Sequence, residues 1–216
     1  GVLWQQKRDL EKAMVDYEKA IELDSTNAKA YFSRGCGRAA KGDRVGALED
    51  YTKAIELDPR HVSAYYNRGN GRMAKADFLG AIEDFNRAIE LNPKMVGAYV
   101  NRGRAREARK DVAGALVDYG KAIHIDPRSH WAYNCRGNVR KAKGDFAGAM
   151  DDYTKVLQLA PNQWQTWANL GVLLSQKGKR AKALEALRKA RSLAPPQVKP
   201  QLDRVIRQVE GRHEVK

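Results

Sequence analysis

The sequence predicts an all-α solenoid built from tandem helix-turn-helix units of 34 residues. Three residue types recur with this period, and such a period is typical of repeat architectures. One helix pair cannot bury its apolar face alone, whereas a stack of pairs can. The recurring residues are Gly35, Gly69, Gly103, Gly137 and Gly171; Ala47, Ala81, Ala115, Ala149 and Ala183; and Pro59, Pro93, Pro127, Pro161 and Pro195.

The segment 62–95 shows how one unit is expected to fold. Its first part, 62–75, has no proline and is compatible with a helix, although its glycines weaken that propensity. Ala76-Asp77 interrupts the run, and Asp77 is expected to cap a second helix. The Asn92-Pro93 pair ends that helix. The second helix carries an apolar stripe at spacings of three and four: Phe78, Ala81, Ile82, Phe85, Ala88 and Ile89.

This pattern resembles the tetratricopeptide repeat, whose signature combines aromatics, a Leu-Gly pair, alanines and a closing proline. The matching positions of the segment 62–95 are Tyr65, Gly69, Ala81, Phe85, Ala88 and Pro93. The resemblance covers nearly the whole chain and implies a right-handed superhelix. Its register predicts a partial repeat with a truncated first helix, five complete repeats, a capping helix and a tail: 1–27; 28–61, 62–95, 96–129, 130–163 and 164–197; 198–210; and 211–216.

Because the first repeat is incomplete in this register, we expect the chain to be an excerpt from a longer protein. Asp9, Ala13, Tyr17 and Ala20 align with the later part of a repeat, and the chain begins with Gly1. The chain has no apolar run long enough to cross a membrane and no signal-peptide pattern. We expect a soluble protein, with the cytoplasm favoured as its compartment.

Arginines replace the leucine and the aromatic that the family pattern places around the glycine. Four repeats have them, together with an aspartate before the second-helix aromatic, and the last repeat has Leu170, Leu174 and Ala186 instead. Two interpretations compete: a basic stripe for an anionic ligand, and buried Arg–Asp networks. The joint loss favours buried networks, because buried charges must be paired. The charged sets are Arg34, Arg38 and Asp50; Arg68, Arg72 and Asp84; Arg102, Arg106 and Asp118; and Arg136, Arg140 and Asp152.

The family resemblance implies a concave groove, lined by the first helix of each pair, that binds a peptide or protein segment. Asparagines spaced one per repeat are similar to the row with which family members hold an extended main chain, although Ser33 and Cys135 interrupt it. Solvated polar groups are the alternative interpretation. A family clamp for terminal carboxylates is disfavoured, since Tyr66, Trp131 and Cys135 stand where basic residues are needed. The expected groove residues are Phe32, Ser33, Tyr66, Asn67, Asn70, Asn101, Arg104, Trp131, Asn134, Asn138, Lys141 and Asn169.

The net charge of +14 favours an acidic partner. The least compensated region is the carboxy-terminal end, which predicts as an alternative function the binding of a polyanion such as RNA or an acidic surface. Nucleic acid is a less favoured partner than protein, and the oligomeric state is open. A further alternative is that the chain is the recognition arm of a larger enzyme.

The sequence gives no reason to expect catalysis, a cofactor or a metal within this chain. Gly35-Cys36-Gly37 and Gly69-Asn70-Gly71 lie inside predicted helices and follow no strand, so they lack the context of a phosphate loop. The four histidines show no metal-ligand spacing. Two cysteines three repeats apart are too distant for a disulfide.

Overall fold

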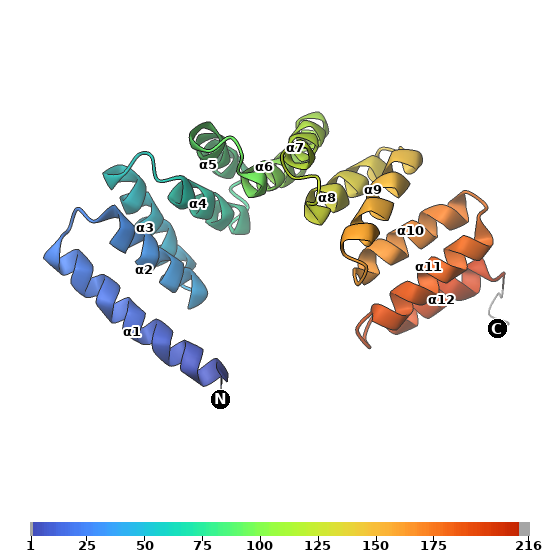
Figure 1. The fold of residues 1–216 in the computed structure, drawn as a ribbon, viewed down its shortest axis with the longest axis horizontal. Helices are drawn as coiled ribbons and strands as arrows, with labels where there is room; N and C mark the ends of the chain where they lie inside the picture. Colours follow the sequence, from blue (N-terminus) through green and yellow to red (C-terminus); the bar gives the residue numbers. More distant parts are fainter. Residues whose placement is uncertain (1, 212–216) are drawn as a thin grey trace. The chain divides into compact units, whose positions relative to one another are not determined.

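The computed structural model describes residues 2–211, and side chains from residue 9 onward. This part of the chain contains twelve helices and no strand, which confirms the predicted all-α class (Figure 1). The helices are α1 (Val2–Leu23), α2 (Ala28–Ala40), α3 (Arg44–Leu57), α4 (Val62–Ala74), α5 (Phe78–Leu91), α6 (Val96–Ala108), α7 (Val112–Ile125), α8 (His130–Ala142), α9 (Phe146–Leu159), α10 (Trp164–Gln176), α11 (Arg180–Leu193) and α12 (Lys199–Val209).

The chain forms two compact units, with the boundary between Ala115 and Leu116. In the first unit, α2 packs on α3 and α4 packs on α5, and each pair also contacts the helix that follows it. Gly69 shows why a small residue recurs at the pair contact. A Cβ atom at Gly69 would lie 2.7 Å from Cε1 of the fully buried Phe85, so α4 and α5 approach closely only with glycine at this position.

The second unit contains the pairs α8–α9 and α10–α11, and α12 packs on α11. Its core joins Tyr153 and Leu157 of α9 to Leu170 and Leu174 of α10. The predicted capping helix is present as α12. Its Leu202 is buried against Ala190 and Ala194, which covers the apolar face of the last pair.

Aspartate caps most of the second helices, as predicted for Asp77. The Asp77 side chain accepts a hydrogen bond from Gly80 N at 3.0 Å. Asp43 and Asp145 do the same for Gly46 and Gly148. Each cap satisfies one of the amide groups that lack a partner at a helix start.

The amino-terminal end differs from the predicted helix-turn-helix register. The repeat alignment places a turn at 7–9, yet α1 is one continuous helix of 22 residues. In the repeat 28–61 the turn is made by Gly42 with a φ of +86°, and Arg8 occupies the corresponding position. The absence of glycine does not by itself explain the continuous helix, because Ala76 and Lys110 form the turn at the same repeat position with φ of +58° and +66°.

Candidate functional site

The candidate site consists of the side chains on the first helices of the pairs, called here the first-helix face of each unit. In the first unit these helices are α2, α4 and α6. Two residues of the predicted row link them, because Asn67 Nδ2 donates to Cys36 Sγ at 3.4 Å and Asn101 Nδ2 donates to Asn70 Oδ1 at 2.7 Å. These asparagines therefore join successive first helices within the protein.

Asn101 is the most buried residue of the predicted set. It is 5% exposed, and its Nδ2 also donates to Tyr66 Oη at 3.2 Å. Its Oδ1 is buried and has no hydrogen-bond partner within the described residues. Any ligand contact with this oxygen requires a local movement of the surrounding side chains.

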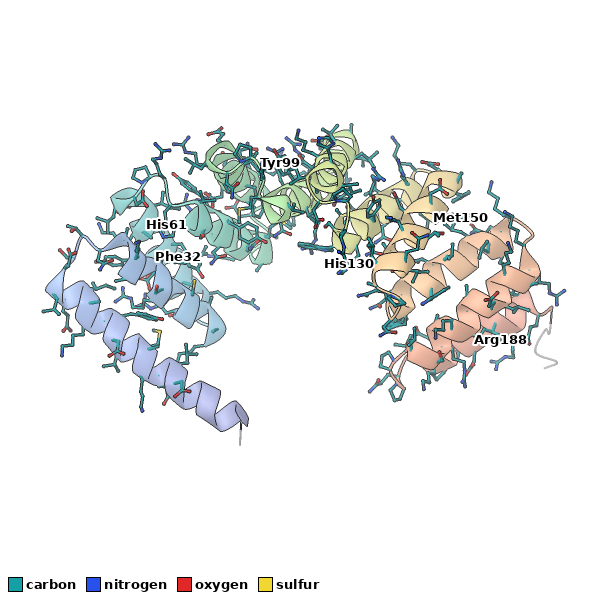
Figure 2. The ribbon with its side chains drawn as sticks, viewed as in Figure 1. Phe32, His61, Tyr99, His130, Met150 and Arg188 are labelled. Carbon is teal, nitrogen blue, oxygen red and sulfur yellow. The ribbon has the colours of Figure 1, made fainter. Side chains whose placement is uncertain are left out.

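The remaining predicted residues of the first unit differ in exposure. Phe32 packs its ring against His61, with 4.6 Å between the ring centroids (Figure 2). Ser33, Tyr66 and Asn70 are half-buried, and Arg104 is exposed. The first unit therefore presents a mixed aromatic and carboxamide surface at this face.

In the second unit α8 and α10 form the first-helix face. Lys141 Nζ donates to Asn169 Oδ1 at 2.9 Å, and Asn169 Nδ2 donates to Asn138 Oδ1 at 3.5 Å. Asn134 Oδ1 accepts from Thr166 Oγ1 at 3.3 Å. Trp131 stands on the first turn of α8 and is 37% exposed. The structure thus brings Asn138, Lys141 and Asn169 into one hydrogen-bonded cluster, whereas Asn134 bonds separately to Thr166. Trp131 lies on α8 with Asn134, Asn138 and Lys141.

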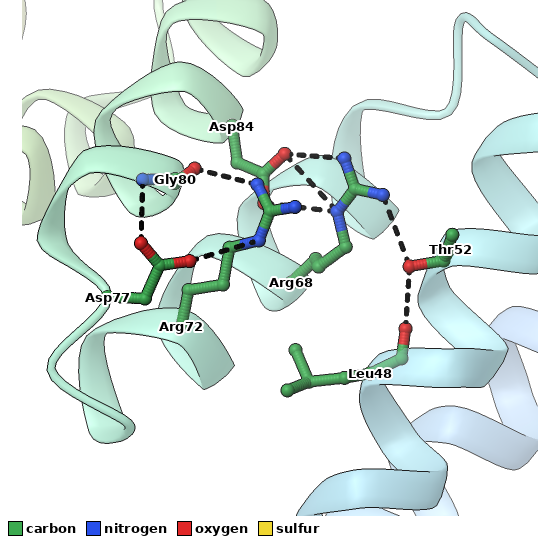
Figure 3. Close-up of polar contacts among 7 residues, drawn as sticks. All are labelled: Leu48, Thr52, Arg68, Arg72, Asp77, Gly80 and Asp84. Atoms are coloured by element: carbon green, nitrogen blue, oxygen red, sulfur yellow. Dashed lines mark hydrogen bonds and ion pairs between the residues drawn. The ribbon is translucent and has the colours of Figure 1, made fainter.

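The arginines around the recurring glycine bind buried aspartates. In the α4–α5 pair, Asp84 is 2% exposed. Arg68 Nη2 lies 2.7 Å from Asp84 Oδ1, and Arg72 Nη1 lies 3.0 Å from Asp84 Oδ2 (Figure 3). This confirms the network interpretation, and equivalent ion pairs join Arg34 and Arg38 to Asp50 and Arg136 and Arg140 to Asp152. Arg102 and Asp118, the corresponding residues of the remaining repeat, belong to different units.

The geometry also explains why the sequence Tyr-x-x-Arg-Gly recurs at 31–35, 65–69, 99–103 and 133–137. The first arginine of each set lies over the ring of the tyrosine one turn earlier, which adds a cation–π contact to the ion pair. The guanidinium carbon is 5.4 to 5.8 Å from the ring centroid in the pairs Tyr31–Arg34, Tyr65–Arg68, Tyr99–Arg102 and Tyr133–Arg136.

The second arginine accounts for a glycine that the sequence interpretation missed. Arg72 Nη1 donates to the Gly80 carbonyl oxygen at 2.9 Å, and a Cβ atom at Gly80 would lie 3.1 Å from Arg72 Cδ. The arginine, the capping aspartate and this glycine therefore form one local arrangement. They are lost together in the last repeat, where Leu174, Lys179 and Lys182 stand at these positions. This joint loss was visible in the repeat alignment.

The first arginine can also reach back to the preceding repeat. Arg68 Nη1 donates to Thr52 Oγ1 at 3.2 Å, and Arg102 Nη1 donates to Asn86 Oδ1 at 2.7 Å. The position that would serve Arg136 is Gly120, and a Cβ atom there would have no neighbour within 4 Å. Arg136 therefore lacks this inter-repeat hydrogen bond.

A cleft of about 630 Å³ in the first unit is lined by α3, α4 and the turn that follows α4, and Arg68 of the Arg68–Asp84 network is part of its lining. Its charges are largely paired, since Lys53 lies 3.2 Å from Glu56 and Arg72 lies 3.7 Å from Asp77. Because acidic and basic side chains line the cleft together, neither charge sign dominates in it, and the cleft is not an obvious site for an ion. The lining residues are Val45, Leu48, Glu49, Thr52, Lys53, Glu56, Arg68, Arg72, Lys75 and Asp77.

The basic carboxy-terminal end is partly compensated. Arg188 Nη2 lies 2.9 Å from Glu210 Oε1, and Arg191 Nη2 donates to Asp203 at 3.1 Å. The hydrogen bond from Arg191 lowers the pKa of Asp203 below its usual value. Four exposed lysines of this end take no part in these two ion pairs: Lys177, Lys179, Lys182 and Lys189. The three charged residues of 212–216 lie outside the described residues.

Two tyrosines beside the networks have altered acidity. Burial is the main cause that raises the pKa of Tyr51 and of Tyr153 above the usual value. The Cys36 contact adds to this effect for Tyr51, and the charge of Asp152 adds to it for Tyr153. Tyr153 Oη donates to Asn138 Oδ1 at 2.7 Å, so this phenol joins α9 to the first-helix face of α8.

Within the part of the chain that the structure describes, no group of three or more His, Cys, Asp or Glu side chains could hold a metal ion. Across the same residues, no helix combines the length and apolar character needed to span a membrane. Neither cysteine forms a disulfide.

Tandem helix pairs with linked first helices define this chain as a helical-repeat scaffold. Three family models, described as "Tetratricopeptide repeat" or "TPR repeat", match residues 66–130, residues 6–36 with 38–75, and residues 141–202. The chain belongs to the tetratricopeptide-repeat family. Members of this family generally act in protein interaction and are generally non-catalytic.

Solved structures show the same fold. pilF of Pseudomonas aeruginosa has a TM-score of 0.81 at 19% identity and covers 95% of this chain and 93% of its own. MamA has a TM-score of 0.69 at 25% identity and covers 74% of this chain and 93% of its own. YrrB, described as "a TPR protein with an unusual peptide-binding site", has a TM-score of 0.70 at 24% identity and covers 88% and 97%. No curated protein sequence gives a significant match.

Proposed function

We propose that the chain is a non-enzymatic scaffold that binds a peptide or an extended protein segment along its first-helix faces. The observation that carries this proposal is the composition of these faces. Half-exposed aromatic and carboxamide side chains gather there, including Tyr66, Asn70, Trp131 and Asn138. Aromatic rings supply contact area and carboxamides both donate and accept hydrogen bonds, which suits recognition of a polypeptide main chain.

Site-specific photo-crosslinking tests which face the partner contacts. Tyr66 and Trp131 are each replaced by p-benzoylphenylalanine, and partners captured from nuclease-treated lysate are identified by mass spectrometry. Leu79 and Val117 serve as matched positions, because they are exposed apolar residues on second helices. We expect crosslinks to a defined set of proteins from the two first-helix positions and few from the other two.

The asparagine row is tested in the same capture with Asn67→Ala/Asn101→Ala. Both side chains bond within the protein, so the melting temperature of this variant must be measured beside its binding. Loss of the captured set with a retained fold supports the row as part of the site. Crosslinking from the second-helix positions alone would refute the proposed face.

A second candidate function is binding of a polyanion through the carboxy-terminal end. It is favoured by the exposed lysines around α11, of which Lys179 stands where other repeats have a capping aspartate. Binding to heparin would then weaken steeply with added salt. Reversal of Lys177, Lys179 and Lys182 to glutamate should abolish it, and unchanged retention would exclude this surface.

A further inference from the structure

A second cleft, of about 510 Å³, lies within the second unit. Its volume falls in the range of roughly 300–1,000 Å³ that is typical of ligand pockets. Unlike the first-helix faces, it is lined mostly by a second helix, α11, and Trp167 of α10 supplies its aromatic part. The lining residues are Trp167, Glu185, Arg188, Lys189 and Ser192.

Trp167 stands where each of the four preceding repeats has a tyrosine. An arginine three residues later lies over each of those tyrosine rings, whereas the residue three after Trp167 is Leu170. The indole therefore lacks the arginine that covers the other rings. Trp167 Nε1 donates to the Pro161 carbonyl oxygen at 2.8 Å. This bond occupies the one polar group of the indole, so a ligand in the cleft meets its ring carbons.

The α11 helix is basic, in contrast to the second helices of the other pairs. It has five lysines and arginines and one glutamate. In α3, α5, α7 and α9 the acidic residues equal or outnumber the lysines and arginines. Lys189 belongs to no ion pair within the described residues, and Arg188 keeps N–H groups beyond its bond to Glu210. The cleft therefore places cationic donors beside an aromatic ring.

One stripe of α11 links the cleft to the exposed lysines at the start of this helix. Lys182 precedes Lys189 by seven residues, so both lie on one side of α11, about 10 Å apart along its axis. Lysines at this separation suit a ligand with repeated negative charges better than a single anion. Aromatic rings beside a basic track are how proteins bind single-stranded nucleic acid, because every base has a π-face and every nucleotide a phosphate.

We propose that this cleft binds a single-stranded nucleic acid, with one base stacked on Trp167 and the flanking phosphates at Arg188 and Lys189. The proposal rests on the second candidate function and names both the polyanion and the way it binds. The lining also holds Glu185, which weakens the attraction of the cleft for negative charge alone. The base contact is therefore what favours a nucleic acid over a polyanion without aromatic groups, such as heparin.

The test compares two single-stranded probes of equal charge by fluorescence anisotropy. The first is a fluorescein-labelled oligothymidylate of ten nucleotides, and the second is an abasic oligodeoxynucleotide with the same label and length. The oligothymidylate should bind about tenfold more tightly, because a base–aromatic stack adds to the phosphate contacts that both probes make. In NMR of the ¹⁵N-labelled chain, the oligothymidylate should shift the Trp167 indole N–H signal, and the abasic probe should shift it much less.

Three tryptophan variants separate stacking from packing. Trp167→Tyr introduces the residue of the preceding repeats and should keep the preference for the oligothymidylate. Trp167→Leu keeps an apolar side chain but removes the stack, so it should bind both probes equally. Trp131→Leu removes a tryptophan that is 37% exposed on the first-helix face and should leave the preference unchanged.

Lys189→Gln tests the phosphate contact. It should weaken binding of both probes and reduce the slope of log K against log salt by about 0.7, the value for one contact with a single strand. Lys121→Gln makes the same change in net charge at the equivalent position of α7, where the lysine is also exposed. This control should change the slope much less.

Equal affinity of the wild-type chain for both probes would overturn the stacking site and leave polyanion binding standing. A Trp167 indole signal that does not move would overturn it as well, whether or not the variants fold. Retained preference in Trp167→Leu would place the base contact elsewhere. Failure of the oligothymidylate to bind while heparin binds would refute nucleic acid as the ligand, and failure of both would refute the second candidate function itself.

Discussion

At the scale of single residues, the buried aspartates compensate the charge of the arginines in their pairs. Asp84 accepts hydrogen bonds from both Nε and Nη2 of Arg68, and Arg72 contributes one further contact. Asp84→Ala leaves Arg68 with no counter-charge and leaves Arg72 with only Asp77, at 3.7 Å. We expect a loss of about 3–5 kcal/mol in the free energy of unfolding, measured by urea denaturation.

The control for this prediction copies the last repeat. The triple variant Arg68→Leu/Arg72→Leu/Asp84→Ala gives the α4–α5 pair the residues that stand at 170, 174 and 186. Replacing a complete buried ion network by apolar residues is often neutral or stabilising. The triple variant should therefore be more stable than Asp84→Ala alone. If Asp84→Ala leaves the melting temperature unchanged, the network does not stabilise the pair.

Tyr153 predicts how stability changes in alkaline solution. Its folded-state pKa is raised, mainly by burial. Below pH of about 10 the phenol is neutral in both the folded and unfolded states. Above that pH the unfolded state releases the proton more readily, so stability falls as pH rises. Tyr153→Phe should reduce this slope between pH 10 and 11 in urea denaturation.

At pH 7 the same variant loses the hydrogen bond to Asn138, at a cost of about 1 kcal/mol. Phe85 fills the equivalent position in the α4–α5 pair, so the ring fits without its hydroxyl. An unchanged slope in Tyr153→Phe would show that another group governs the alkaline behaviour.

At the scale of helices, Gly120 is a gap in a series of inter-repeat hydrogen bonds. Asparagine at this position would offer Arg136 the acceptor that Asn86 offers Arg102, and the site has room for a side chain. Gly120→Ala should stabilise the protein by about 1 kcal/mol through helix propensity alone. Gly120→Asn should equal or exceed this gain despite its poorer propensity, as measured by thermal unfolding. A clearly less stable Gly120→Asn would exclude the hydrogen bond.

The sequence was sufficient to predict the helix pairs because the residues that begin and end a helix recur in successive repeats. Asp77 and the Asn92-Pro93 pair mark the bounds of α5, which the structure places at Phe78–Leu91. The continuous α1 was not predicted, because Asp9, Ala13, Tyr17 and Ala20 match the second helix of a repeat whether or not a turn precedes it. The Arg–Asp pairing was inferred because arginine and aspartate disappear together in one repeat.

The site was less predictable than the fold. Position in the repeat indicated which asparagines lie on the first-helix faces. It did not show that Asn67, Asn101 and Asn169 bond to the preceding first helix. Hydrogen-bond direction depends on which donors surround each carboxamide, and a donor-only group such as Lys141 becomes decisive only in three dimensions.

At the scale of the whole chain, stability should be local. In each unit, the described helix contacts join helices that follow one another closely in the chain. Loss of one pair should therefore weaken its neighbours and spare distant pairs. Hydrogen exchange measured by mass spectrometry should show faster exchange in α4 and α5 of Asp84→Ala, with α10 and α11 changed much less. Equal acceleration throughout would indicate a single cooperative unit.

The unequal bonding of the two arginines to their aspartate constrains how such a repeat can change over generations. Exchange of the second arginine for leucine keeps a two-point ion pair between the first arginine and the aspartate, as between Arg68 and Asp84. Replacement of only the first arginine or only the aspartate then leaves a buried charge without a counter-charge. A repeat that changes from the charged to the apolar form can therefore lose the second arginine first, with little loss of stability. The first arginine and the aspartate must then be replaced together. Descendants that carry a lone Arg–Asp pair should be common, and those that carry a lone buried aspartate should be rare.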